Sequence, residues 1–259
     1  MKALACLLAA ATLFAAEPII EDITVSGTRA YLVKPSGKIE NAAAILFVHW
    51  LEPESPDSNR TQFLAQAIDL ARSGVVSLLP ETMWSDPRWF GRRDPSKDYD
   101  NSLKQAESLK RALDFLLAIP GIDTSRVAYV GHDFGAMYGL LLSRDDKRPR
   151  FWALQAGTSN FEDWYLYGRQ NLPEAEKAKV RETLQPISPI RFLPDLNAPV
   201  LLQFGNRDPH VPLPRANAQA SAASSPKQVL YYEAGHGLNQ QAIADRMHWL
   251  RTQLGLKHE

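Results

Sequence analysis

The chain has 259 residues, of which 45% are hydrophobic and 22% are charged. It therefore has enough apolar material for a packed core, and its composition excludes global disorder. Its 29 basic residues balance 29 acidic ones, so it lacks the positive field that attracts nucleic acids or acidic membranes. The single cysteine excludes a disulfide scaffold and a cysteine-based zinc cluster.

Residues Met1–Ala16 have the pattern of a secretory signal peptide. Lys2 provides the basic start, a run of small and apolar residues follows, and Glu17-Pro18 ends the run. The run is shorter than the roughly 20 apolar residues that a membrane-spanning helix needs. We therefore expect cleavage, export to the periplasm or the medium, and no membrane span in the mature chain. Cleavage after Ala16 would leave residues 17–259 as a single domain and remove Cys6, the only cysteine.

Strand patterns and helical patterns alternate along the mature chain. Residues 19–33 alternate weakly and predict an antiparallel hairpin that turns at Ser26-Gly27. Continuous apolar runs, typical of strands buried on both faces, then alternate with apolar residues at helical spacing. The predicted strands are Ala42–His49, Val75–Leu79, Arg126–Gly131, Phe151–Ala156, Val200–Phe204 and Val229–Glu233, and the predicted helices are Arg60–Ser73, Asn101–Leu117, Phe134–Leu142, Glu174–Leu184 and Ala242–Leu254. This order predicts an α/β fold, in which a mostly parallel sheet has helices on both faces and a small lid lies at about residues 160–195.

Reactive side chains follow several predicted strands at their carboxyl ends, where parallel sheets place their sites. Residues 131–135 (GHDFG) have the form glycine–x–nucleophile–x–glycine, in which the glycines permit a cramped turn that exposes the central side chain. Asp208 follows the strand at 200–204, and His236 lies between two glycines after the strand at 229–233. The chain order nucleophile, acid, histidine predicts a triad of Asp133, Asp208 and His236.

A second loop completes the candidate site. His49 and Trp50 end the first parallel strand, beside the predicted turn. The backbone N–H groups of Trp50 and Phe134 are therefore the expected oxyanion hole.

These motifs resemble the α/β-hydrolase superfamily over nearly the whole mature chain. The most similar branch is that of dienelactone hydrolases and the catalytic domains of prolyl-oligopeptidase-like enzymes, as in residues 121–127 (GIDTSRV), 187–190 (ISPI) and 199–202 (PVLL). The resemblance implies the three-layer α/β-hydrolase fold and a hydrolytic activity. That branch usually carries serine or cysteine at the elbow. The Gly-His-Asp-aromatic-Gly elbow around Asp133 is instead similar to those of epoxide hydrolases and haloalkane dehalogenases.

An aspartate at this position favours attack on an sp³ carbon that bears a leaving group. The product would be an ester of Asp133, and His236, oriented by Asp208, would activate water to hydrolyse it. Two carboxylates beside one imidazole also favour the protonated form of His236, which opposes its role as a base. Two alternatives stay open: Asp133 as a base in carboxylic ester or lactone hydrolysis, and an inactive binding protein of the same fold.

Aromatic residues gather in two predicted loops and favour a pocket for a small, largely apolar substrate. A tyrosine there would supply the acid for opening an epoxide, and a tryptophan N–H would suit a departing halide, although Phe134 cannot donate. The candidate lining residues are His49, Trp84, Tyr99, Trp164, Tyr165 and Tyr167.

The histidines give no sign of a metal site. His49 can also brace its own loop, His132 is expected to contact backbone, and His210, His248 and His258 are expected at the surface. Since no two of them have ligand spacing with an open position, we predict no metal and no cofactor.

Overall fold

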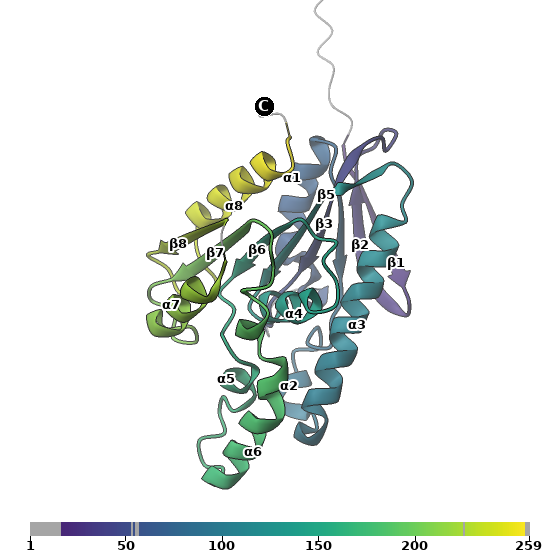
Figure 1. Ribbon diagram of the computed structural model, residues 1–259. Helices are drawn as coiled ribbons and strands as arrows, with labels where there is room; N and C mark the ends of the chain where they lie inside the picture. Colours follow the sequence, from purple (N-terminus) through teal and green to yellow (C-terminus); the bar gives the residue numbers. More distant parts are fainter. Residues whose placement is uncertain (1–16, 53, 55–56, 225, 257–259) are drawn as a thin grey trace, which may run out of the picture.

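The computed structural model describes residues 17–52, 54, 57–224 and 226–256. The predicted signal peptide at residues 1–16 lies outside them. Within these ranges no helix combines the length and the apolar character needed to cross a bilayer. The described residues form one eight-stranded sheet in the order β1-β2-β4-β3-β5-β6-β7-β8, with helices on both of its faces (Figure 1).

The sheet begins with the predicted hairpin. Strands β1 (Ile19–Val25) and β2 (Thr28–Lys34) pair antiparallel, and β2 pairs antiparallel with β4 (Val76–Pro80). The two turn residues, Ser26 and Gly27, have φ values of 50° and 84°, as a tight two-residue hairpin turn requires. The predicted hairpin and its turn are confirmed.

The remaining strands are parallel to one another and to β4. They are β3 (Ala42–Val48), β5 (Ile122–His132), β6 (Phe151–Gln155), β7 (Val200–Gly205) and β8 (Lys227–Tyr232). Strands β3, β4 and β7 are buried along their whole length, as their continuous apolar sequences predict. The expected mostly parallel sheet is therefore confirmed, and it brings the carboxyl ends of β3, β5, β7 and β8 to one edge.

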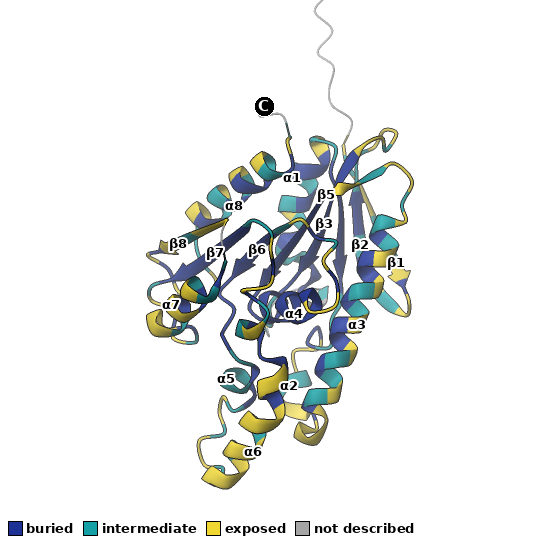
Figure 2. Cartoon of the chain, in the orientation of Figure 1, coloured by how far each residue is buried: buried dark blue, intermediate teal, exposed yellow. Residues whose placement is uncertain are grey.

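Alternate residues of each strand point to opposite faces and build one large core on each face of the sheet. One face is covered by α3, α4 and α7, and the other by α1 and α8. All residues of α4 are buried, which Figure 2 shows as a dark helix against the sheet. The helix bounds are α1 Leu64–Arg72, α2 Trp89–Arg92, α3 Asp98–Leu117, α4 Phe134–Ser143, α5 Phe161–Tyr165, α6 Glu174–Leu184, α7 Leu213–Ala222 and α8 Gln240–Gln253, and the 3-10 helices are η1 Asp57–Phe63, η2 Pro95–Lys97, η3 Gln185–Ile187 and η4 Pro189–Arg191.

Helices α5 and α6 lie between β6 and β7 in the chain and extend below the sheet in Figure 1. In α6 only Leu184 is buried, and most of the helix is exposed in Figure 2. These helices occupy the region where the sequence suggests a lid. Helix α7 was not predicted, because its buried residues are one alanine and one glutamine, Ala216 and Gln219, which carry no apolar periodicity.

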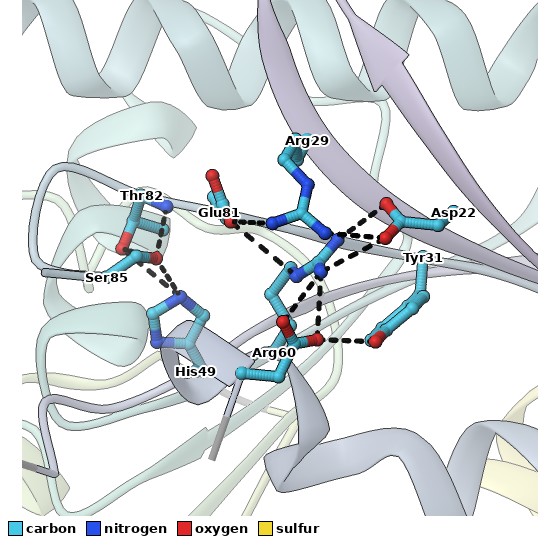
Figure 3. Close-up of polar contacts among 9 residues, drawn as sticks. Asp22, Arg29, Tyr31, His49, Arg60, Glu81, Thr82 and Ser85 are labelled. Carbon is cyan, nitrogen blue, oxygen red and sulfur yellow. Dashed lines mark hydrogen bonds and ion pairs between the residues drawn. The ribbon is translucent and has the colours of Figure 1, made fainter. Parts of the chain in front are cut away.

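A buried arginine holds the segment after β3 against the hairpin (Figure 3). The Arg60 side chain has no exposed surface and pairs with Asp22 of β1 at 2.9 Å and with Asp57 at 2.8 Å. Its guanidinium lies 4.1 Å from the ring centroid of Tyr31, whose hydroxyl donates to Asp57. Because a buried cation must keep its counter-ions, this network fixes η1 in place.

We expect Arg60→Met to lower the Tm by at least about 6 °C, because it removes the buried partner of three carboxylates, those of Asp22, Asp57 and Glu81. The matched control is Arg29→Met. Arg29 also pairs with Asp22, but its side chain is 51% exposed, so its loss should move the Tm by less than about 2 °C. Thermal unfolding followed by circular dichroism measures both, and equal shifts in the two variants would contradict this role of Arg60.

Candidate active site

Asp133 occupies a strained turn between β5 and α4. Its φ of 54° and ψ of −118° are rare for a residue with a side chain. The turn also needs close backbone approach, because a Cβ on Gly131 would lie 2.4 Å from the carbonyl oxygen of Gly135. A Cβ on Gly135 would lie 2.0 Å from the carbonyl oxygen of Val48. Both glycines of the motif are therefore required for the turn that presents Asp133.

The structure brings Asp133, Asp208 and His236 together. His236 Nδ1 lies 2.8 Å from Asp208 Oδ2, and the other oxygen of Asp208 accepts the backbone N–H groups of His210 and Val211 at 2.8 and 3.1 Å. On the opposite side of the imidazole, Nε2 lies 3.7 Å from Asp133 Oδ1. Both of these atoms are buried and have no hydrogen-bond partner within the described part of the chain.

The two carboxylates decide the charge of the imidazole. Burial lowers the pKa of His236, but the hydrogen bond to Asp208 and the negative charges of Asp133 and Asp208 outweigh it and raise the pKa to about 10. Burial raises the pKa of Asp208, yet the contacts with His236 and two backbone amides hold it below its usual value. At neutral pH the site therefore contains an imidazolium between two carboxylate groups.

A backbone amide faces the carboxylate of Asp133, but it is not the predicted one. The N–H of Leu51 points to Asp133 Oδ2 at 3.4 Å. The N–H of Trp50 donates instead to the side-chain oxygen of Gln62 at 2.8 Å, which contradicts the role predicted for it. Phe134 is the first residue of α4, and the N–H of a first helical residue has no acceptor within its helix.

Asp133 and His236 open on a cavity of about 530 Å³. Aromatic rings form much of its wall, from the loop after β3, from α2 and from α5. The side chain of Glu52 also lines it, and Tyr167 at 52% exposure lies at the boundary with solvent. The aromatic lining residues are Trp50, Phe90, Phe134, Trp164, Tyr167 and His210. A largely apolar molecule of modest size fits such a cavity.

Four of the six predicted pocket residues do not line this cavity. Trp84 has no exposed surface and donates its indole N–H to the carbonyl oxygen of His49 at 3.1 Å. Tyr165 is 1% exposed, and its hydroxyl contacts that of Tyr138 at 2.6 Å. Tyr99 packs against the core from α3. Trp84 and Tyr165 build the layer behind Phe134, while Trp164 and Tyr167 reach the cavity.

His49 has a structural position. It is 2% exposed, and burial lowers its pKa to about 4, so the ring is neutral. Its Nδ1–H donates to the carbonyl oxygen of Trp50 at 2.6 Å. Its Nε2 accepts from the hydroxyl of Ser85 at 3.0 Å (Figure 3). The ring therefore braces its own loop, which is one of the two roles that the sequence suggests for His49.

Sequence reasoning missed His210. It was expected at the surface, but it lines the cavity, with its ring centroid 5.1 Å from that of His236 and 4.9 Å from that of Trp164. Its position two residues after Asp208, in the same loop, was the available signal.

His132 donates to the backbone oxygen of His236 at 2.9 Å, His248 is exposed, and His258 lies outside the described residues. Among the described residues no three acidic, cysteine or histidine side chains gather as metal ligands would.

The chain matches no family model and no curated relative, but its fold has close structural neighbours. It superposes on an acetyl xylan esterase from Paenibacillus sp. R4 with a TM-score of 0.70 and 17% identity, covering 87% of this chain and 79% of the other. A second acetyl xylan esterase, from Thermoanaerobacterium sp. JW/SL YS485, gives 0.68 and 14%, covering 94% and 86%. A proposed dienelactone hydrolase from Klebsiella pneumoniae gives 0.66 and 16%, covering 92% and 98%. The chain has the α/β-hydrolase fold.

We expect Asp133→Asn to lower the pKa of His236 from about 10 towards the ordinary value near 6.5, because it removes one of two neighbouring charges. NMR titration of ¹³C-labelled histidine measures this, with the exposed surface variant Asp100→Asn as the control. The folded pKa lies above the unfolded one, so the contribution of His236 to stability is complete below about pH 6.5 and is lost as the pH rises through about 10. An unchanged His236 pKa in Asp133→Asn would show that Asp133 does not hold the proton.

Proposed function

We propose that this protein is a hydrolase that uses Asp133 as a nucleophile towards an sp³ carbon of a small, largely apolar substrate. The observation that carries the proposal is the 3.4 Å contact between the N–H of Leu51 and Asp133 Oδ2. An oxyanion hole serves the oxygen on which charge develops. When water attacks an ester of Asp133, that oxygen belongs to Asp133 itself, and Leu51 is already aimed at it.

The charge of the site favours the same order of events. In the resting enzyme His236 holds a proton between Asp133 and Asp208 and cannot act as a base. Formation of an ester removes the charge of Asp133, which lowers the pKa of His236. In its neutral form His236 can then accept a proton from water in the second step. The covalent route therefore removes the conflict between two carboxylates and one catalytic base.

The two alternatives fit less well. If Asp133 were only a base for water attacking a carboxylic ester, the amide of Leu51 would have to serve a substrate oxygen, whereas its contact in this structure is with Asp133 Oδ2. An inactive binding protein would gain nothing from the strained backbone of Asp133 or from two buried atoms without hydrogen bonds, each of which costs stability. Strain of this kind is typical of a functional site.

The decisive experiment is a single turnover in H₂¹⁸O with styrene oxide as the first probe, followed by peptide mass spectrometry. A covalent Asp133 ester hydrolysed at its carbonyl leaves one heavy oxygen on Asp133, while the product takes an old carboxylate oxygen. Direct attack of water on the substrate labels only the product. An unlabelled Asp133 peptide after confirmed turnover contradicts the covalent route.

Asp133→Asn tests the same role by rate. The two side chains have nearly equal volume, so we expect turnover to fall by at least about 100-fold with little change in the Tm. Mass spectrometry of the variant checks that the asparagine has not deamidated. Wild-type turnover by an intact asparagine variant removes Asp133 from the nucleophile role.

We also propose that the protein is exported, on the basis of residues 1–16. Expression of the full chain followed by fractionation and N-terminal sequencing tests this. We expect a mature protein that begins near Glu17, outside the cytoplasm. Recovery of full-length protein starting at Met1 in the cytoplasm is the contrary result.

A further inference from the structure

We propose that His236 enters the reaction as an acid: its imidazolium protonates the leaving oxygen while Asp133 attacks carbon. The substrates are then strained cyclic ethers such as epoxides, whose leaving oxygen is basic and stays on the product. This inference rests on the proposed covalent role of Asp133 and extends it, because it names the acid and the class of substrate.

The first support is the position of the imidazole. Its two nitrogens lie 2.8 Å from Asp208 and 3.7 Å from Asp133, on opposite sides of the ring. The other titratable groups near it are His132 beside the elbow and His210 in the loop after β7. Burial lowers the pKa of both, and the charge of His236 lowers each further. Both are therefore neutral, and the positive charge belongs to His236.

Glu52 and Tyr167 complete the titratable lining of the cavity. They come from the loop after β3 and from the segment after α5. Neither has a hydrogen bond or ion pair to His236 among the described residues. The carboxylates that hold the proton are Asp133 and Asp208.

The second support is that the distances allow the transfer. A carbon poised for attack lies about 3–3.5 Å from the attacking oxygen, so a leaving oxygen one bond further on lies roughly 4.5–5 Å from it. A hydrogen bond of about 2.8 Å from Nε2 to that leaving oxygen closes a triangle with the 3.7 Å separation of Nε2 and Asp133 Oδ1. The three lengths are mutually compatible, so the separation of Nε2 and Asp133 Oδ1 permits one substrate to contact both atoms.

The third support is the state of the other donors. Tyr138 and Tyr165 share their hydroxyl hydrogen bond behind Phe134, and the indole N–H of Trp84 is bonded to His49. Trp164 also lines the cavity, and its buried indole N–H, like Nε2 of His236, has no partner among the described residues, but an indole N–H does not give up its proton. A halide needs N–H donors and no proton, whereas the charged donor beside Asp133 is one that can give a proton away.

The atoms and charges of the reaction balance with the epoxide and water as the only reactants. A lone pair of Asp133 forms a bond to carbon, the ring C–O bond breaks, and the ring oxygen takes the Nε2 proton, which leaves a hydroxyalkyl ester and neutral His236. Nε2 then accepts a proton from water as the hydroxide adds to the carbonyl carbon of Asp133. Collapse expels the diol oxygen, which takes the proton back from His236. The new carboxylic acid finally protonates His236, and the sum is epoxide plus water to diol.

The test compares two probes that share a phenylethyl skeleton, styrene oxide and 2-phenylethyl bromide. Rapid quenching and peptide mass spectrometry measure how fast each forms an ester on Asp133 in the wild type, in His236→Gln and in the control His248→Gln, which changes an exposed histidine of α8. In His236→Gln we expect ester formation from the epoxide to fall at least about 100-fold, and ester formation from the bromide to change less than about 3-fold. His248→Gln should match the wild type with both probes.

The outcomes separate the two proposals. Equal rates with the epoxide in His236→Gln and the wild type overturn the role of His236 as acid, and so does an equal loss with both probes. The absence of any ester on Asp133, from either probe in the wild type, overturns the proposed function itself.

A second measurement needs no variant. In the wild type, ester formation from the epoxide should decline as the pH rises through about 10, whereas ester formation from the bromide should not. Parallel pH profiles for the two probes overturn the proposal.

Discussion

One imidazole held between two carboxylates is the interaction on which the site depends. Three separate strands lead to the three groups: β5 ends one residue before Asp133, β7 leads to Asp208, and β8 leads to His236. Parallel strands end at one edge of the sheet, which is why residues distant in sequence meet there. Bringing these groups together lowers the stability of the fold, since Asp133 has a strained backbone and its Oδ1 lacks a hydrogen bond among the described residues. The packing of the buried helix α4 against the sheet stabilises this arrangement.

The loop after β3 depends on a different set of contacts. Gln62 accepts the N–H of Trp50 and donates to His132, so one side chain ties that loop to the elbow. Gln62 belongs to η1, and η1 is fixed to the N-terminal hairpin by Arg60. The direction of the Leu51 amide therefore depends on an ion-pair network on the far side of the loop. The antiparallel hairpin thus contributes to the geometry of the active site without touching it.

The sequence predicts the fold well where burial leaves a simple pattern. Strands β3 and β4 are recognisable because both of their faces are covered, and the elbow is recognisable because two glycines are needed where backbone approaches backbone. The periodicity of apolar residues indicates which side chains are buried but not where each one points. It therefore could not distinguish Trp84, which packs behind Phe134, from Trp164, which lines the cavity. Which of two consecutive amides faces Asp133 depends on the side chain of Gln62, a contact that no local pattern records.

The residue at the elbow sets more than the type of nucleophile. A neutral nucleophile would leave His236 with one carboxylate neighbour, Asp208, and a pKa nearer its ordinary value, as a base requires. Asp133 adds a second negative charge within 3.7 Å, and the imidazole then carries a proton in the resting state. That charge disappears when Asp133 is esterified and returns when the ester is hydrolysed. In the mechanism proposed here, the nucleophile therefore sets the proton state of its own partner, and one histidine serves as acid before the ester forms and as base afterwards.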